Sequence, residues 1–368
     1  MSKNYQQILE NIASPSKSIY DQAKAHIDNL AKPPGSLGRL ENIAARLCGI
    51  SGSMSPSIAK RCVIVMAADN GVIAEGVASA PEEVTAIQTL NMLDGVAGIN
   101  VIAKQFNTDL FIVDMGINGD MTHPDLIDKK IRKSTGNIAK EMAFSRHEAE
   151  LAIEAGIALA GDAKTLGNQL IGVGEMGIGN TTTSSTVLAA LLGLEGDEIA
   201  KVVGKGAGLE EAAFLKKVKV VQTALQLHQP DKNDPIEVLH KVGGLDLAAM
   251  TGVYLGAAYY QLPVVIDGFI SVVAALCAAK LHPLASKYMF ASHHSFERGY
   301  AFAIEQLGLK PGIYLEMRLG EGSGCPLMFA IMDASLAVLK NMATFESGNI
   351  STDYVEKVDK IKEAAVLE

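Results

Sequence analysis

The stretch Cys62-Val63-Ile64-Val65-Met66-Ala67-Ala68-Asp69 decides the fold, because it is short, continuously apolar and ends in a carboxylate. A strand of a parallel sheet is buried on both faces, so it carries an unbroken apolar run. Comparable runs occur at residues 109–114, 169–173, 263–269 and 288–292. Because helical patterns separate these runs, the sequence predicts an α/β fold with a doubly wound parallel sheet.

Helical spacing of apolar residues accounts for most of the remaining chain. It predicts helices over much of residues 1–30 and at 40–50, 82–92, 142–163 and 187–194. Between the first two lies Lys32-Pro33-Pro34-Gly35-Ser36-Leu37-Gly38-Arg39-Leu40-Glu41, where prolines and glycines predict a shaped connector without regular structure.

Composition excludes several classes of protein. The 368 residues are 48% hydrophobic and include no Trp, which suits a large aliphatic core. A net charge of −9 argues against a nucleic-acid or anionic-membrane surface. Four scattered cysteines without a CxxC pair favour a reducing, cytoplasmic setting. We expect no membrane span, because the longest apolar run, residues 269–279, is shorter than the roughly 20 residues that a span requires.

Polar residues cluster after the predicted strands, where open α/β sheets bind ligands. Asp69 and Asn70 follow the first strand, and Gly174–Ser184 follows the third. The latter is a glycine turn that runs into hydroxyl side chains at the start of a helix. Such a helix start binds anions, and phosphate is the natural candidate, although simple capping by Thr and Ser explains the pattern equally well.

Glu175 lies inside this turn, where a carboxylate would repel phosphate but accept hydrogen bonds from a ribose diol. A second glycine-rich turn, Gly204–Leu209, precedes Lys216 and Lys217, and a lysine here would neutralise the phosphate. For Lys216 and Lys219 a solvated helix face is the simpler interpretation.

Two further segments carry candidate chemistry. In Arg318-Leu319-Gly320-Glu321-Gly322-Ser323-Gly324, glycines surround one carboxylate, which predicts either a general base at a ligand site or an ordinary solvated turn. Ser292-His293-His294-Ser295 follows the last strand and offers seryl donors to an anion. Adjacent histidines seldom share a metal, so we expect no metal site, and no activated nucleophile is apparent.

Five motifs together are similar to the nicotinate-nucleotide:5,6-dimethylbenzimidazole phosphoribosyltransferase family, in collinear order over essentially the whole chain. They are residues 32–41, 172–182, 243–252, 267–269 and 318–324. The resemblance implies a Rossmann-like large domain at residues 31–331, a small helical domain from residues 1–30 and 332–368, and a dimer. It also implies transfer of 5-phosphoribose from nicotinate mononucleotide to the lower-ligand base of a cobamide, with inversion and release of nicotinate.

By this resemblance Glu321 is the general base, and neither a cofactor nor a metal is required. The ribose and phosphate are expected at Glu175, Lys217 (or its neighbour Lys216), Gly174, Gly177, Asn180, Thr181, Gly206, Ser292 and Ser295. The acceptor base is expected at Gln88, Ala80 and Leu319. One base suffices, because nicotinate leaves from a pyridinium and is neutral at its nitrogen.

The acceptor side departs from the family pattern. Asn70 stands where the family often has His, and Ala80 precedes Pro81 where Ser or Tyr is common. These changes leave open a branch that transfers phosphoribose to phenol or p-cresol together with a paralogue. A non-catalytic subunit of such a heterodimer is a further alternative, which the intact Glu321 turn disfavours.

Overall fold

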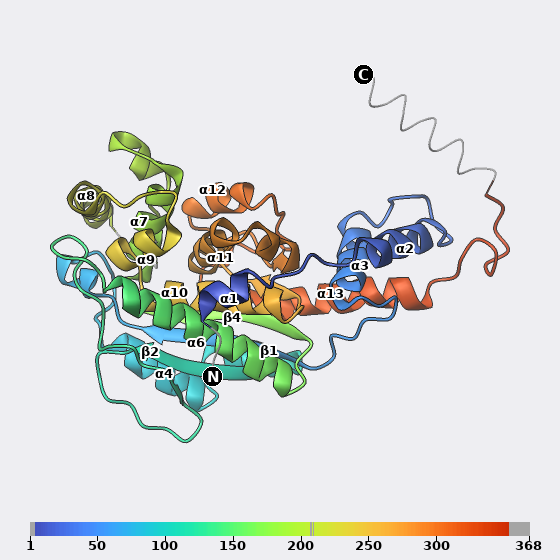
Figure 1. Cartoon of the computed structure of the whole chain (residues 1–368), viewed down its shortest axis with the longest axis horizontal. Coiled ribbons are helices and arrows are strands. Elements are labelled where there is room, and N and C mark those ends of the chain that lie inside the picture. The colour runs from blue at the N-terminus through green and yellow to red at the C-terminus, as the bar shows by residue number, and fades with distance from the viewer. Residues whose placement is uncertain (1–3, 207, 209, 353–368) are drawn as a thin grey trace. The chain divides into compact units, whose positions relative to one another are not determined.

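The computed structural model describes residues 4–206, 208 and 210–352, and its centre is a six-stranded parallel sheet (Figure 1). The strands are β1 (Arg61–Ala68), β2 (Asp109–Gly116), β3 (Ile127–Asp128), β4 (Leu170–Met176), β5 (Val264–Ile266) and β6 (Met289–Ala291). Their order is β3-β2-β1-β4-β5-β6, and every neighbouring pair is parallel. This is the strand order of a Rossmann-like fold, whose ligand crevice lies where the order reverses, between β1 and β4.

The five predicted strands are confirmed, with two differences. Strand β3 was not predicted, because two residues are too short for an apolar run. The predicted strand at 263–269 ends instead at Ile266, and Phe269 already begins a helix after Gly268.

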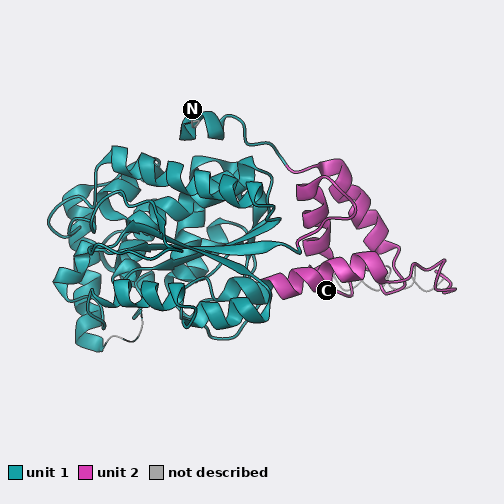
Figure 2. Ribbon diagram, turned by 90° about the horizontal axis from the view of Figure 1, so that it is seen from below, with its two compact units in different colours: residues 1–14, 59–328 teal, residues 15–58, 329–368 magenta. Residues whose placement is uncertain are grey.

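Helices lie on both faces of the sheet (Figure 2). The helices of the described residues, in both compact units, are α1 (Tyr5–Leu9), α2 (Lys17–Asp28), α3 (Arg39–Ser51), η1 (Gly71–Glu75), α4 (Val84–Leu93), α5 (Gly98–Gln105), α6 (Arg146–Thr165), α7 (Asn180–Leu192), η2 (Gly196–Lys201), α8 (Glu211–His228), α9 (Pro235–Val242), α10 (Leu245–Tyr259), α11 (Phe269–Leu281), η3 (Pro283–Tyr288), α12 (Gly299–Gln306) and α13 (Gly324–Asn341). The helix predicted at 187–194 begins earlier in the structure, because α7 starts at Asn180 and includes the run of hydroxyl residues. The N-terminal helical stretch divides into α1 and α2 around Pro15.

Helices α6 and α10 pack closely together beside the sheet. A Cβ on Gly252 would lie 2.0 Å from the carbonyl oxygen of Ile153, so only glycine permits this backbone approach. Helices α10 and α11 are buried along almost their whole length, which explains why their sequences lack a polar face.

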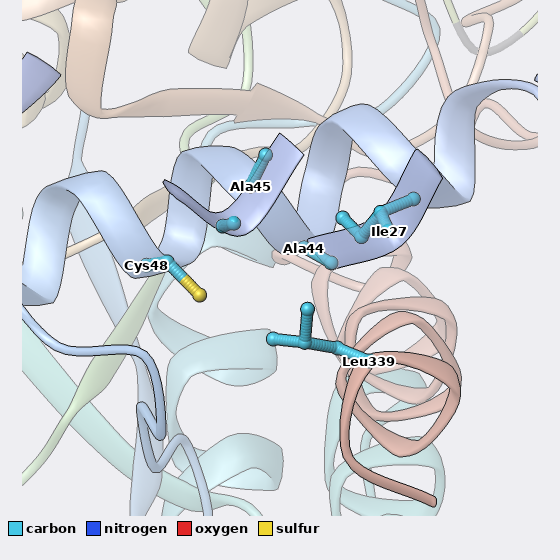
Figure 3. Packing of buried hydrophobic residues seen from close by; sticks show 6 residues of the cluster. Ile27, Ala44, Ala45, Cys48 and Leu339 are labelled. Atoms are coloured by element: carbon cyan, nitrogen blue, oxygen red, sulfur yellow. The ribbon is translucent and has the colours of Figure 1, made fainter. Parts of the chain in front are cut away.

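The chain forms two compact units, residues 1–14 with 59–328 and residues 15–58 with 329–368 (Figure 2). The second unit has its own core of Ala23, Ile27, Ala44, Ala45, Cys48 and Leu339 (Figure 3). The predicted division at residue 31 therefore differs from the structure, because α3 packs on α2 while α1 hydrogen-bonds to α6 through Tyr5 and Glu154. Residues 1–3 and 353–368 of the predicted small domain lie outside the described residues.

The connector at residues 32–41 is closed by a buried ion pair. Lys32 Nζ donates to Glu41 Oε1 at 2.8 Å, and the side chains are 5% and 3% exposed. The same carboxylate oxygen accepts from the backbone N–H of Leu37 at 3.0 Å. Glu41, the last residue of the segment, therefore holds both its first residue, Lys32, and the backbone at Leu37.

Replacement of Glu41 by Gln should destabilise the second unit by about 3–5 kcal/mol, because it leaves a buried lysine without its counter-charge. Urea unfolding followed by circular dichroism measures this change. Asp21→Asn is the control, since Asp21 pairs with Lys17 at the surface and should change stability by about 0.5 kcal/mol or less. Equal stability of Glu41→Gln and wild type would contradict the prediction.

No helix in the described part of the chain is long and apolar enough to cross a membrane.

Candidate active site

A cavity of about 320 Å³ opens where the carboxyl ends of the strands meet. Segments that follow β1, β4, β5 and β6 line it, together with residues 318–321 just before α13. All of these belong to the first compact unit. The cavity therefore lies at the ligand-binding edge of an open α/β sheet.

Glu321 enters this cavity from a turn with unusual backbone geometry. Gly320, Glu321 and Gly322 have φ angles of 83°, 63° and 82°, so three consecutive residues are left-handed. The Glu321 side chain is 4% exposed and accepts two hydrogen bonds, from Gln88 Nε2 to Oε1 at 2.6 Å and from the Ile99 N–H to Oε2 at 3.0 Å. Two donors thus orient the carboxylate, and each of its oxygens keeps a free lone pair.

The turn lies directly against β4. A Cβ on Gly174 would be 2.5 Å from the backbone nitrogen of Gly322, so the glycine makes room for the turn. Gly174, which the sequence places at the ribose or phosphate, does not line the cavity but packs against this turn.

Glu175 lies at the wall of the cavity in a group of buried acids. Asn180 donates through its side-chain amide both to Glu175 and to Asp246, the latter at 3.1 Å. Burial raises the pKa of Glu175 to about 8, and the negative charge of Asp246 adds to the effect while the Asn180 hydrogen bond opposes it. Burial also raises the pKa of Asp246 to about 6. Asn180 therefore bridges two carboxyl groups and fixes the direction of Glu175.

Lys217 supplies a buried cation to the same cavity. Its side chain is fully buried, and Nζ donates to Thr181 Oγ1 at 2.8 Å, in the first turn of α7. Burial lowers the pKa of Lys217 to about 8, which the nearby Glu297 carboxylate opposes. Lys216 is exposed on α8, so of the two alternatives it is Lys217 that reaches the cavity.

Only some of the residues that follow β6 line the cavity. Ser295 and His293 line the cavity, whereas Ser292 is buried behind it, where its hydroxyl donates to the carbonyl oxygen of Asp267 at 3.1 Å. Ser295 therefore lies where the predicted contact with an anion requires it, whereas Ser292 does not line the cavity. The two histidines diverge, because His294 stacks on Tyr314. The described residues contain no group of three or more His, Cys, Asp or Glu that could hold a metal ion.

The residues predicted to contact the acceptor base, Ala80, Gln88 and Leu319, line the cavity, as do Gly177 and Gly206. Asn70, by contrast, is fully buried beside it and accepts from Thr183 Oγ1 at 3.2 Å. Asp69 is likewise buried and accepts from the Asn118 N–H at 2.8 Å. Both residues support the crevice and do not line it.

Four charged residues at or behind the cavity had no assigned role from sequence: Asp246, Asp267, Glu297 and Arg318. The sequence signal that could have identified two of them is an acidic residue in an otherwise apolar segment, as at Asp246 in α10 and Asp267 after β5. Such an acid is expensive to bury, so it has a specific partner.

The pH dependence of stability should report on Glu175. Its pKa of about 8 lies above the value near 4.3 of an unfolded glutamate. The folded state therefore binds the proton more tightly, and the free energy of unfolding should fall by up to a few kcal/mol as the pH rises from about 5 to about 8. Glu175→Gln should flatten this slope in urea titrations, whereas Glu305→Gln on the exposed face of α12 should not. Identical slopes for Glu175→Gln and wild type would rule out this assignment.

Comparison with known proteins gives the family of this chain. A family model described as phosphoribosyltransferase matches residues 12–350, which gives the class of enzyme. Nicotinate-nucleotide–dimethylbenzimidazole phosphoribosyltransferases from Clostridium perfringens and Ruminiclostridium cellulolyticum are 51% and 45% identical, over 96% and 94% of this chain and 97% of each relative. The crystal structure of CobT from Thermus thermophilus matches with a TM-score of 0.86 and 38% identity, covering 91% of this chain and 99% of that one.

The chain belongs to the nicotinate-nucleotide–dimethylbenzimidazole phosphoribosyltransferase family. The predicted fold and class of enzyme are thereby confirmed. The alternatives of a phenol-transferring branch and of a non-catalytic subunit gain no support from these relatives, whose names state the dimethylbenzimidazole activity.

Proposed function

We propose that this enzyme moves 5-phosphoribose from nicotinate mononucleotide to 5,6-dimethylbenzimidazole and releases nicotinate, a step that activates the lower ligand in cobalamin biosynthesis. The relatives bear this activity in their names. The observation that carries the proposal is that one cavity joins the Glu321 carboxylate, oriented by two donors, to the buried Lys217 ammonium.

The phosphate half of the site is assigned to Lys217, Thr181 and the start of α7. Lys217 and Thr181 already share a hydrogen bond of 2.8 Å. The backbone of Gly177 and Gly179 lines the cavity just before the helix begins. A cation, a hydroxyl and a helix N-terminus together suit the phosphate group of a mononucleotide, and Gly206 and Ser295 complete this side.

Glu175 is assigned to the ribose. Because Asn180 holds one of its oxygens, the other is available to accept from a ribose hydroxyl. In its ionised form the carboxylate would also stabilise positive charge that develops on the ribose as the bond to nicotinate breaks.

Glu321 is assigned to the acceptor, with Gln88, Ala80 and Leu319 beside it. The bond between the anomeric carbon and the pyridinium nitrogen breaks, and its electron pair remains on nicotinate. One ring nitrogen of dimethylbenzimidazole bonds to the anomeric carbon from the opposite face, and Glu321 accepts the proton from the other ring nitrogen. The proton and electrons balance without a cofactor.

The test is an acceptor comparison with the purified chain and nicotinate mononucleotide, followed by chromatography of released nicotinate. We expect release with dimethylbenzimidazole and much slower release with phenol. Release that depends on phenol, or that requires a second protein, would overturn the proposal.

We further propose that the enzyme is a cytoplasmic dimer. The family resemblance implies the dimer, and four buried, unpaired cysteines favour a reducing compartment. A light-scattering mass equal to that of one chain would reject the dimer.

A further inference from the structure

The backbone of Glu321 is held in a conformation that requires external support. Its φ of 63° lies between left-handed glycines on both sides. Glycine adopts this region freely, but a glutamate does so at a cost in free energy. Something outside the turn must therefore stabilise it if the carboxylate is to stay in one place.

Asp267 supplies this support from the sheet. It follows β5 directly and is 1% exposed. Its Oδ2 accepts from the Gly322 N–H at 3.2 Å, and its Oδ1 accepts from the Gly324 N–H at 2.7 Å. The two donors lie one and three residues after Glu321, so one buried carboxylate holds the backbone that follows Glu321.

The surroundings of Asp267 suit a carboxylate in this role. Burial raises its pKa, and the adjacent His293, whose Nδ1 lies 3.8 Å from Oδ1, opposes that effect together with the two backbone donors. Gly324 is the first residue of α13, so the helix start adds a favourable field. A Cβ on Gly324 would be 2.9 Å from Asp267 Oδ1, so the contact also requires glycine there.

Asp267 does not itself line the cavity, whereas Glu321 does. The Glu321 side chain is oriented separately, by Gln88 and Ile99. Asp267 thus fixes where the backbone of Glu321 lies, while the other two residues fix where its oxygens point.

We infer that Asp267 is a positioning residue, which holds the left-handed turn so that the Glu321 carboxylate faces the acceptor. The inference rests on the proposed role of Glu321 as general base. An ordinary capping role for α13 is the competing explanation, and it would affect folding without acting through Glu321.

A double-mutant cycle separates the two explanations. Asp267→Asn keeps the shape but replaces an acceptor oxygen by an amide, and it should lower kcat by roughly 10- to 100-fold through misplacement of the base. The KM for nicotinate mononucleotide should stay within about twofold, because the phosphate and ribose contacts remain. In a Glu321→Gln background the same change should cost about threefold or less, since the group it positions is already inactive.

Asp234→Asn is the matched control. Asp234 also accepts from two backbone N–H groups, those of Ile236 and Glu237 at the start of α9, and it does not line the cavity. We expect this variant to lower the melting temperature and to leave kcat unchanged.

Several outcomes would overturn the inference. An equal loss of rate in both backgrounds means that Asp267 does not act through Glu321, and no loss in the wild-type background means that it positions nothing. If Asp267→Asn does not fold, Asp267→Ser, which keeps one acceptor, replaces it in the cycle. If neither variant folds, the hydrogen bonds of Asp267 serve only to stabilise the fold, and the inference is rejected. A fully active Glu321→Gln would instead refute the proposed base.

Discussion

Glu321→Gln should lower kcat by about 10²- to 10⁴-fold, the usual contribution of a positioned general base. Glutamine has nearly the same shape, so Gln88 and the turn can remain in place, but the amide cannot accept the acceptor's proton. Affinity for nicotinate mononucleotide should change little, because the residues proposed to bind its phosphate, Lys217 and Thr181, are unaltered. Steady-state kinetics and calorimetric titration measure the two quantities separately.

Glu316→Gln is the control for this variant. Glu316 precedes the same turn, is exposed, and also has a left-handed backbone, with a φ of 54°. It should retain wild-type kcat. A Glu321→Gln enzyme with the wild-type rate would remove Glu321 from the mechanism.

Lys217→Met should lower kcat/KM for nicotinate mononucleotide by roughly 30- to 1,000-fold, the effect of removing one partner from a buried charge contact worth about 2–4 kcal/mol. Methionine has a similar length and tolerates burial, so we expect the variant to fold. The loss should appear mainly in KM, because the phosphate is bound throughout the reaction.

Lys216→Met is the matched control, since this neighbour is exposed on the same helix. It should behave as wild type. Equal losses in the two variants would assign the effect to α8 as a whole and contradict a specific contact between Lys217 and phosphate.

The buried position of Lys217 also predicts a pH effect. Because its pKa is lowered to about 8, the free enzyme loses this positive charge as the pH rises through that value. The kcat/KM for nicotinate mononucleotide, which reports ionisations of the free enzyme, should therefore fall above about pH 8. In Lys217→Met this alkaline decline should disappear.

The sheet was predictable because its physical signal is local. The strand at residues 62–69 must be apolar throughout, since helices cover both of its faces. The two-residue β3 carries no such signal. The division of the chain into units depends on contacts between distant segments, such as Ala44 with Leu339, and periodicity cannot reveal these.

The same distinction holds for the site. Glu175 and Glu321 were identified because each lies in a glycine-rich motif, and Lys217 because it follows the glycine-rich turn at residues 204–209. Their supporting partners come from other elements, as Asp246 does from α10 and Asp267 from the end of β5. Asp246 and Asp267 also lie in quoted motifs, but nothing in those motifs shows which residues they support. A motif shows that an acidic residue is present. Which N–H groups donate hydrogen bonds to that residue depends on the tertiary fold.

The most direct test of the whole account is the anomeric configuration of the product, measured by NMR after the purified chain has reacted with nicotinate mononucleotide and dimethylbenzimidazole. We predict one equivalent of nicotinate and one equivalent of the α-linked ribotide of the base, because in the proposed reaction the acceptor attacks from the face opposite the leaving group. A β-linked product, or nicotinate release without any product of the base, would contradict it.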